Sequence, residues 1–161
     1  EVLTSQPLSQ VLDLDWNYQI RVIQPAVSYD FLVGWTKEPA ISSDLIRQVK
    51  GAIKEEFLQE SQSAVKNLEK GLREGNQKEI ETSIKRADKN LKSLNPLIYT
   101  PALKVLQEAT EGLSACAKSS GAGGGDCGIA LSFDPVETQT LIDRWKEKNI
   151  EVIYQERMGD S

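Results

Sequence analysis

The stretch KSSGAGGGDCGIAL, residues 118–131, holds five glycines in fourteen positions. Glycine this dense costs backbone entropy on folding, so a folded protein keeps it where the backbone is unusual or another group comes very close. Consecutive glycines also let several backbone N–H groups converge on one anion, and Lys118, Ser119 and Ser120 add a cation and two hydroxyls. The stretch therefore predicts an anion site, and the alternative is a flexible connector.

The composition describes an ordinary folded protein. The 161 residues are 39% hydrophobic and 27% charged, enough for one domain with a core, with or without a fragment of another. A net charge of −5 without a Lys/Arg cluster argues against a nucleic-acid or anionic-membrane partner. No apolar run approaches the roughly 20 residues that span a bilayer.

Two residue types limit the chemistry further. The chain has no histidine, and its two cysteines, Cys116 and Cys127, do not form a CxxC pair, so a usual zinc site and a His-based triad are excluded. Two reduced cysteines fit a cytoplasmic protein, and we expect no disulfide between them. The chain starts at Glu1 in an unremarkable stretch, and we expect a processed or excised piece.

The first third of the chain changes from strand to helix periodicity. Residues 16–23 are aromatic and β-branched and predict a strand, and residues 29–36 predict a second strand that could form a hairpin with the first. From Ser43 the apolar period becomes 3.6, which predicts one long amphipathic helix, weakened at Gly51 and ending near residues 71–75.

Two further helices follow. One carries apolar residues from Ile80 to Leu94 and stops before Asn95-Pro96. The next has Thr100 as N-cap and a proline at its first position, and we expect it to run to about Cys116.

A strand over 127–133, a helix from Asp134-Pro135 and a strand over 150–154 complete the chain. The predicted order is β-β-α-α-α-β-α-β. It favours an α+β fold of ferredoxin-like type, with an antiparallel or mixed four-stranded sheet covered by helices on one face.

The predicted context excludes three familiar glycine loops. Gly123, Gly125 and Gly128 match GxGxxG, but a dinucleotide site needs a strand before the motif and a helix after it, and here we expect the reverse. No Gly-Lys-Ser/Thr closes a P-loop. A protein-kinase loop needs strands on both sides together with His-Arg-Asp and Asp-Phe-Gly motifs, which the sequence lacks.

The stretch SSGAGGGDCGIAL resembles the third conserved motif of the GHMP kinase superfamily, which includes galactokinases, homoserine kinases, mevalonate kinases and phosphomevalonate kinases. Its Asp126-Cys127 ending is similar to the phosphomevalonate kinase branch. FLVGWTKEPAISSDLI, residues 31–46, resembles the strand and Ser-rich turn of that family. YTPALKVL, residues 99–106, resembles the helix start that precedes the motif.

The resemblance covers only the C-terminal half of such an enzyme. It implies that residues 1–24 are the end of the N-terminal kinase domain or a linking strand, and that residues 25–161 are the ferredoxin-like GHMP kinase C-terminal domain. The family's first two motifs and its catalytic aspartate or lysine have no counterpart here. We therefore expect no catalytic residue and no metal ligand in this chain, and no turnover by the chain alone.

The activity that the resemblance implies is ATP- and Mg²⁺-dependent phosphorylation of phosphomevalonate to diphosphomevalonate, in the mevalonate route to isoprenoids. The partners would be this small-molecule substrate and the missing N-terminal half. Two alternatives stay open. The chain could belong to another GHMP small-molecule kinase such as a mevalonate kinase, or it could be a non-catalytic ferredoxin-like module that binds an anion or a protein.

The predicted binding residues form two groups. The resemblance implies a backbone cradle for the substrate phosphate, with residues 121–123 closest, and a serine turn before the long helix whose simpler explanation is an N-cap. Asp126, at the junction of loop and strand, is not expected to be the base. The predicted substrate- and phosphate-binding residues are Lys118, Ser119, Ser120, Gly121, Ala122, Gly123, Gly124, Gly125, Ser42 and Ser43.

Overall fold

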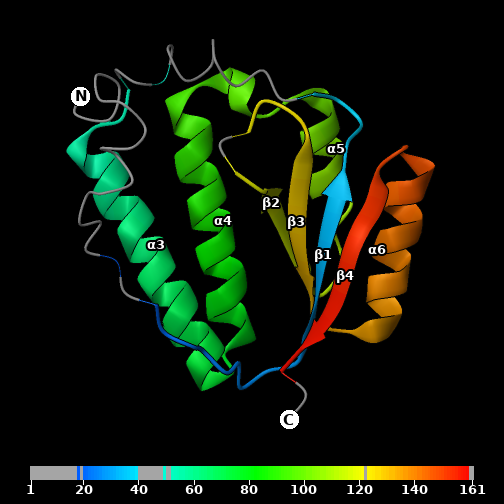
Figure 1. The fold of residues 1–161 in the computed structure, drawn as a ribbon, viewed down its shortest axis with the longest axis horizontal. Coiled ribbons are helices and arrows are strands. Elements are labelled where there is room, and N and C mark those ends of the chain that lie inside the picture. The colour runs from blue at the N-terminus through cyan, green and yellow to red at the C-terminus, as the bar shows by residue number, and fades with distance from the viewer. Residues whose placement is uncertain (1–17, 19, 40–48, 50–51, 122, 160–161) are drawn as a thin grey trace, which may run out of the picture.

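A four-stranded antiparallel sheet forms the centre of the fold (Figure 1). The computed structural model describes residues 18, 20–39, 49, 52–121 and 123–159. The strand order is β2-β3-β1-β4, so β2 and β4 are the edges. The strands are β1 (Tyr29–Trp35), β2 (Ala115–Ser119), β3 (Cys127–Ser132) and β4 (Glu151–Met158). The predicted α+β class with a four-stranded sheet is confirmed, and all its pairings are antiparallel.

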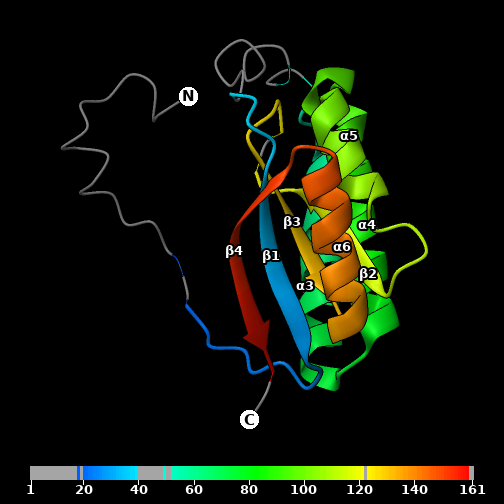
Figure 2. The same ribbon diagram turned by 90° about the vertical axis from the view of Figure 1, so that its right-hand side faces the viewer.

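The helices are α3 (Glu55–Glu74), α4 (Gln77–Leu94), the short 3₁₀ helix η2 (Pro96–Ile98), α5 (Pro101–Glu108) and α6 (Pro135–Glu147). Helices α5 and α6 lie behind the sheet, while α3 and α4 run side by side next to its β2 edge (Figures 1 and 2). None of the helices in the described ranges is both long and apolar enough to cross a membrane.

Side-chain caps set the helix starts. The side chains of Asn76, Thr100 and Asp134 each accept a backbone N–H from the first turn of α4, α5 and α6 respectively. At the other end of α3, Gly75 takes the left-handed conformation, with φ 68°, that closes a helix. The starts at Thr100 and Asp134 and the end at Gly75 agree with the sequence predictions.

The core follows the alternation of the strands. Leu32, Ala130 and Ala117 are aligned across β1, β3 and β2 and pack, with Leu106 and Trp145, between the sheet and helices α5 and α6.

The neighbouring positions on the three strands face the opposite way. Phe31, Leu131 and Cys116 are aligned across β1, β3 and β2 and pack with Ile80 and Ile84 of α4. Helix α4 therefore covers the β2 side of this second face.

The predicted first strand is wrong. Of residues 16–23, the structure describes 18 and 20–23, and these form neither strand nor helix. Ile20 and Val22 are more than four-fifths exposed. Strand propensity reflects packing on a half-buried, paired surface, and these side chains pack on no such surface.

Two helix predictions also need correction. The helix expected from Ser43 is interrupted, because residues 52–54 are not helical and α3 starts at Glu55; residues 43–48 lie outside the described ranges. The helix expected to reach Cys116 ends at Glu108, and Gly112, with φ 75°, lies in the turn that leads into β2. The small residues of β2 alternate between two faces, so that they pack against α5 on one face and α4 on the other.

Candidate functional site

The glycine-rich stretch connects two antiparallel strands. Ser119 of β2 is aligned with Gly128 of β3, and the Ser120 N–H donates to the Cys127 carbonyl at 3.0 Å. The prediction that a helix leads into the loop is therefore wrong. A dinucleotide site stays excluded because a strand, not a helix, follows the loop. Strands on both sides do fit a protein-kinase loop, so only the missing companion motifs exclude that class.

One side of the loop is held by η2. The Gly124 N–H donates to the Ile98 carbonyl at 2.8 Å. Gly123 and Gly124 have φ values of 82° and 84°. A Cβ on Gly123 would lie 2.4 Å from both the carbonyl oxygen and Cγ2 of Ile98. What comes close to Gly123 is the protein itself.

The other side of the loop is held by the segment that follows β1. The Asp126 N–H donates to the Glu38 carbonyl at 2.7 Å, and the Asp126 carbonyl accepts both the N–H and the hydroxyl of Thr36 at 2.8 and 2.7 Å. A Cβ on Gly125 would lie 3.0 Å from the Pro39 carbonyl oxygen. Gly125 is therefore also required by a protein contact.

The tip of the loop is open. Ser120 and Gly121 are exposed, and a Cβ on Gly121 would have nothing within 4 Å. Ala122 lies outside the described residues. Of the glycines at 121, 123 and 125, only Gly121 leaves room for a group from outside the protein to approach.

Lys118 is turned back onto its own strand. Its Nζ donates to the Ser119 carbonyl. Burial lowers the pKa of Lys118, and the negative charge of Asp88 opposes this shift. The predicted cation therefore lies half-buried next to the base of the loop.

The structure describes the predicted loop serines but not the two serines predicted before the long helix. Ser119 is 1% exposed, and its hydroxyl donates to the Gly121 carbonyl at 3.3 Å, so it braces the loop from inside. Ser42 and Ser43 lie outside the described residues. The segment just before them, residues 36–39, contacts the far side of the loop.

Three residues that frame the loop were not predicted from the sequence: Thr36, Ile98 and Tyr99. Tyr99 accepts the Ser119 N–H on its hydroxyl at 3.2 Å. Thr36 and Tyr99 lie inside the quoted motifs FLVGWTKEPAISSDLI and YTPALKVL. That both motifs belong to the same family resemblance as the loop could have suggested that they hold it, although no local pattern gives the contact.

The two cysteines differ in accessibility, and both are free. Burial raises the pKa of Cys116 to about 12, whereas Cys127 is only partly buried and its pKa is raised by burial and by the Asp126 charge.

We expect iodoacetamide at about pH 8 to alkylate Cys127 in the folded protein and Cys116 only after unfolding, because the thiolate is the nucleophile. Peptide mass spectrometry with and without urea measures this, and rapid native labelling of Cys116 would contradict it. The folded pKa of Cys116 lies above its unfolded value, so its contribution to stability is complete below about pH 8.5 and is lost as the pH rises toward 12.

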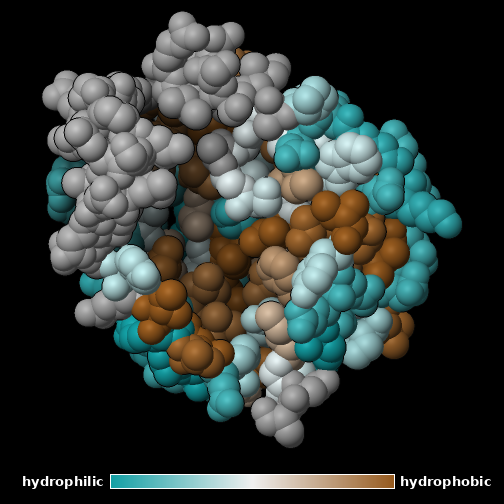
Figure 3. All heavy atoms as spheres, in the orientation of Figure 1, coloured by the Kyte–Doolittle hydropathy of each residue, from teal (hydrophilic) through white to brown (hydrophobic). Residues whose placement is uncertain are grey.

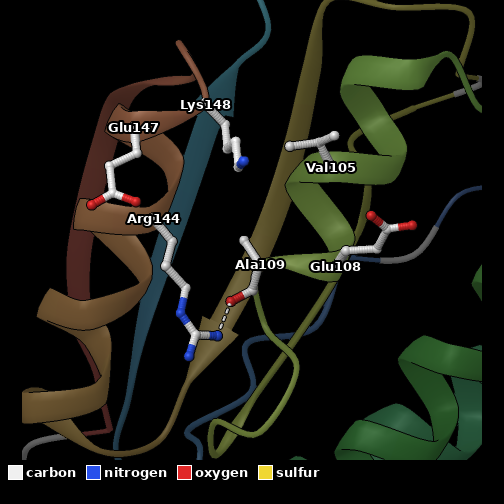
Figure 4. Close-up of a pocket in the computed structure, with 6 residues that line it drawn as sticks. All are labelled: Val105, Glu108, Ala109, Arg144, Glu147 and Lys148. Carbon is white, nitrogen blue, oxygen red and sulfur yellow. Dashed lines mark hydrogen bonds between the residues drawn. The ribbon is translucent and has the colours of Figure 1, made fainter.

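The described part also has pockets away from the loop. One lies between α5 and α6 (Figure 4), where Arg144 donates to the carbonyls of Ala109 and Glu111 at 2.8 Å and Lys148 points into the space between the helices. Arg144 here closes the C-terminal end of α5 rather than facing a ligand.

Comparisons with known proteins agree on one family. The family model described as "GHMP kinases C terminal" matches residues 64–151. A phosphomevalonate kinase of Streptomyces sp. (strain CL190) is 31% identical over 135 residues, which cover 77% of this chain and 36% of that protein.

Solved structures give the same result. The Streptococcus pneumoniae phosphomevalonate kinase has a TM-score of 0.87 and 47% identity, covering 97% of this chain and 48% of its own. The same enzyme in complex with phosphomevalonate and AMPPNP has a TM-score of 0.86 and 47% identity, covering 97% and 47%. The L. major mevalonate kinase, at 16% identity and a TM-score of 0.70, shares the fold. The chain thus spans half or less of the length of these relatives.

Proposed function

This chain belongs to the GHMP kinases through their C-terminal domain, and we propose that it forms the substrate-binding part of an ATP-dependent phosphomevalonate kinase. Such an enzyme transfers the terminal phosphoryl group of ATP to the phosphate of phosphomevalonate, which gives diphosphomevalonate in the mevalonate route to isoprenoids. The observation that carries the proposal is the glycine loop, which is held from both sides and is open at Ser120 and Gly121.

The loop suits phosphoryl transfer because that reaction depends mainly on positioning and on charge stabilisation. The Ser120 hydroxyl and the Gly121 N–H have no hydrogen-bond partner within the described ranges, so both can donate to a phosphate oxygen. We rank these two residues first in the cradle of residues 118–125. Ser119 supports the loop from inside, Lys118 adds a positive charge next to its base, and Ser42 and Ser43 are proposed as a second contact to the phosphate.

The proposed cofactors of the complete enzyme are ATP and Mg²⁺. Across the described part, no three residues of the His, Cys, Asp and Glu types lie together as a metal site would require. We therefore assign no metal ligand among the described residues, and we propose, as the family resemblance implies, that the ligands of both cofactors lie mostly in the N-terminal half of the enzyme. The chain alone is proposed to be inactive, and its two free thiols fit a cytoplasmic protein.

An apolar hollow supports the proposed N-terminal partner. Figure 3 shows hydrophobic side chains gathered in a depression between α3 and the β1–β4 part of the sheet. Val65 of α3 and Ile153 and Tyr154 of β4 are about half exposed or more. Exposed apolar surface of this kind marks an interface, and we propose that the other half of the enzyme covers it.

The assay that tests the function compares two acceptors. With ATP and the complete enzyme, we expect a higher kcat/KM for phosphomevalonate than for mevalonate. Preferential turnover of mevalonate would favour the mevalonate kinase alternative. A reading frame upstream of Glu1 without a Gly-Ser-Ser phosphate loop would favour a non-catalytic anion-binding module.

A further inference from the structure

The outer edge of β2 has no neighbouring strand in the described sheet, and side chains pair with some of its outward backbone groups. The Ser120 N–H points toward β3, so the Ser119 N–H points away from it, because successive backbone groups of a strand alternate in direction. The Ser119 N–H donates to the Tyr99 hydroxyl at 3.2 Å. On the same edge, Gln107 Nε2 donates to the Ala117 carbonyl at 3.4 Å.

Both of these side chains are anchored on one buried carboxylate. The Tyr99 hydroxyl donates to Asp88 Oδ1, and Gln107 Nε2 donates to Asp88 Oδ2 at 2.7 Å. Lys92 Nζ lies 2.8 Å from Asp88 Oδ2 and 4.3 Å from the centre of the Tyr99 ring. The Asp88 side chain is 6% exposed. We call Asp88, Lys92, Tyr99 and Gln107 the Asp88 network; it joins α4, α5 and the residue after η2 to the edge of β2.

The network holds the same turn that grips the loop. Ile98, whose carbonyl accepts the Gly124 N–H, directly precedes Tyr99, whose hydroxyl accepts the Ser119 N–H. Two adjacent residues thus hold the backbone on both sides of the open tip, Ser120–Gly121. Asp88 fixes the Tyr99 hydroxyl and so fixes where the tip begins.

We propose that the Asp88 network positions the loop tip for the acceptor phosphate, with Tyr99 as the residue that transmits the position. Tyr99 acts through Ser119 and does not touch the substrate. That the loop tip binds the acceptor phosphate rests on the proposed function, whereas the effect of Tyr99 on the loop backbone does not.

Tyr99→Phe separates positioning from packing. The Tyr99 ring is buried with Ile98 and Leu103, so phenylalanine keeps these contacts and removes only the hydroxyl. The Ser119 N–H then loses its acceptor and the Asp88 carboxylate loses a donor. Tyr29→Phe is the matched control, because Tyr29 is equally buried, lies at the far end of β1 and has no hydroxyl partner among the described residues.

The complete enzyme carrying each variant is compared by hydrogen–deuterium exchange and by kinetics. In Tyr99→Phe, we expect the amides of residues 119–126 to exchange about tenfold faster while those of α6 keep their rate. KM for phosphomevalonate should rise about tenfold, and KM for ATP should change by less than about twofold. Tyr29→Phe should change none of these.

Unchanged exchange in residues 119–126, or an equal increase in α6, would overturn the proposal, because the network would then only stabilise the fold. If Tyr99→Phe does not fold, Gln107→Leu removes the bond to Ala117 with a side chain of similar size, and it is held to the same test with a smaller increase expected. Failure of the wild-type enzyme to phosphorylate phosphomevalonate would contradict the proposed function but would leave the exchange result decisive for the loop.

Discussion

Gly123→Ala should lower the thermal unfolding midpoint of the protein by roughly 10 °C. The new Cβ would lie 2.4 Å from the Ile98 carbonyl oxygen, and the φ of 82° is one that alanine rarely adopts. Backbone strain and forced displacement together cost about 3 kcal/mol, and about 3 °C is lost per kcal/mol in a protein of this size. Thermal unfolding followed by circular dichroism measures the shift.

Two alanine controls separate the causes. Gly112→Ala has a similar φ of 75° but nothing within 4 Å of the new Cβ, so it should cost only the strain, about 1 kcal/mol. Gly121→Ala adds a methyl group in open space and should leave the midpoint within about 1 °C. If Gly123→Ala were as mild as Gly112→Ala, the contact with Ile98 would not hold the loop.

Local signals predicted where α5 and α6 begin and where α3 ends, because these causes are local. Thr100 and Asp134 cap the first turns through their own side chains, and Gly75 closes α3 through its own φ. Strand β2 was not predicted, whereas β3 and β4 were, with β4 running to Met158 beyond its predicted end at residue 154. The residues of β2 are small, and only contacts with α4, α5 and β3 show that they form a strand.

The loop shows the same limit. The glycine pattern correctly pointed to close approach and unusual backbone geometry. It could not tell whether a ligand or the protein comes close, because Ile98 and Pro39 are distant in sequence from Gly123 and Gly125. Sequence reasoning placed residues 121–123 nearest the phosphate, and the contacts now single out Gly121 as the glycine with free space. Gly123 is consequently unsuitable for testing a ligand, since any side chain there meets Ile98 first.

Gly121→Val is the sharper test of phosphate binding. The valine Cβ would have nothing of the described protein within 4 Å, so the side chain would occupy the open space at the loop tip, where the proposed acceptor phosphate approaches. Misplacement of a reacting group by about 1 Å can cost about 100-fold in rate. We therefore expect kcat/KM for phosphomevalonate to fall about 100-fold in the complete enzyme, with the unfolding midpoint within about 2 °C of wild type.

The graded series at this position makes the result specific. Gly121→Ala is smaller and should reduce kcat/KM by about tenfold, whereas an indirect effect through folding would follow the unfolding midpoint instead of side-chain size. KM for ATP should stay within about twofold in both variants, because we place ATP on the other half of the enzyme. Wild-type kinetics in Gly121→Val would mean that the loop only connects β2 to β3, and the acceptor phosphate would have to be bound elsewhere.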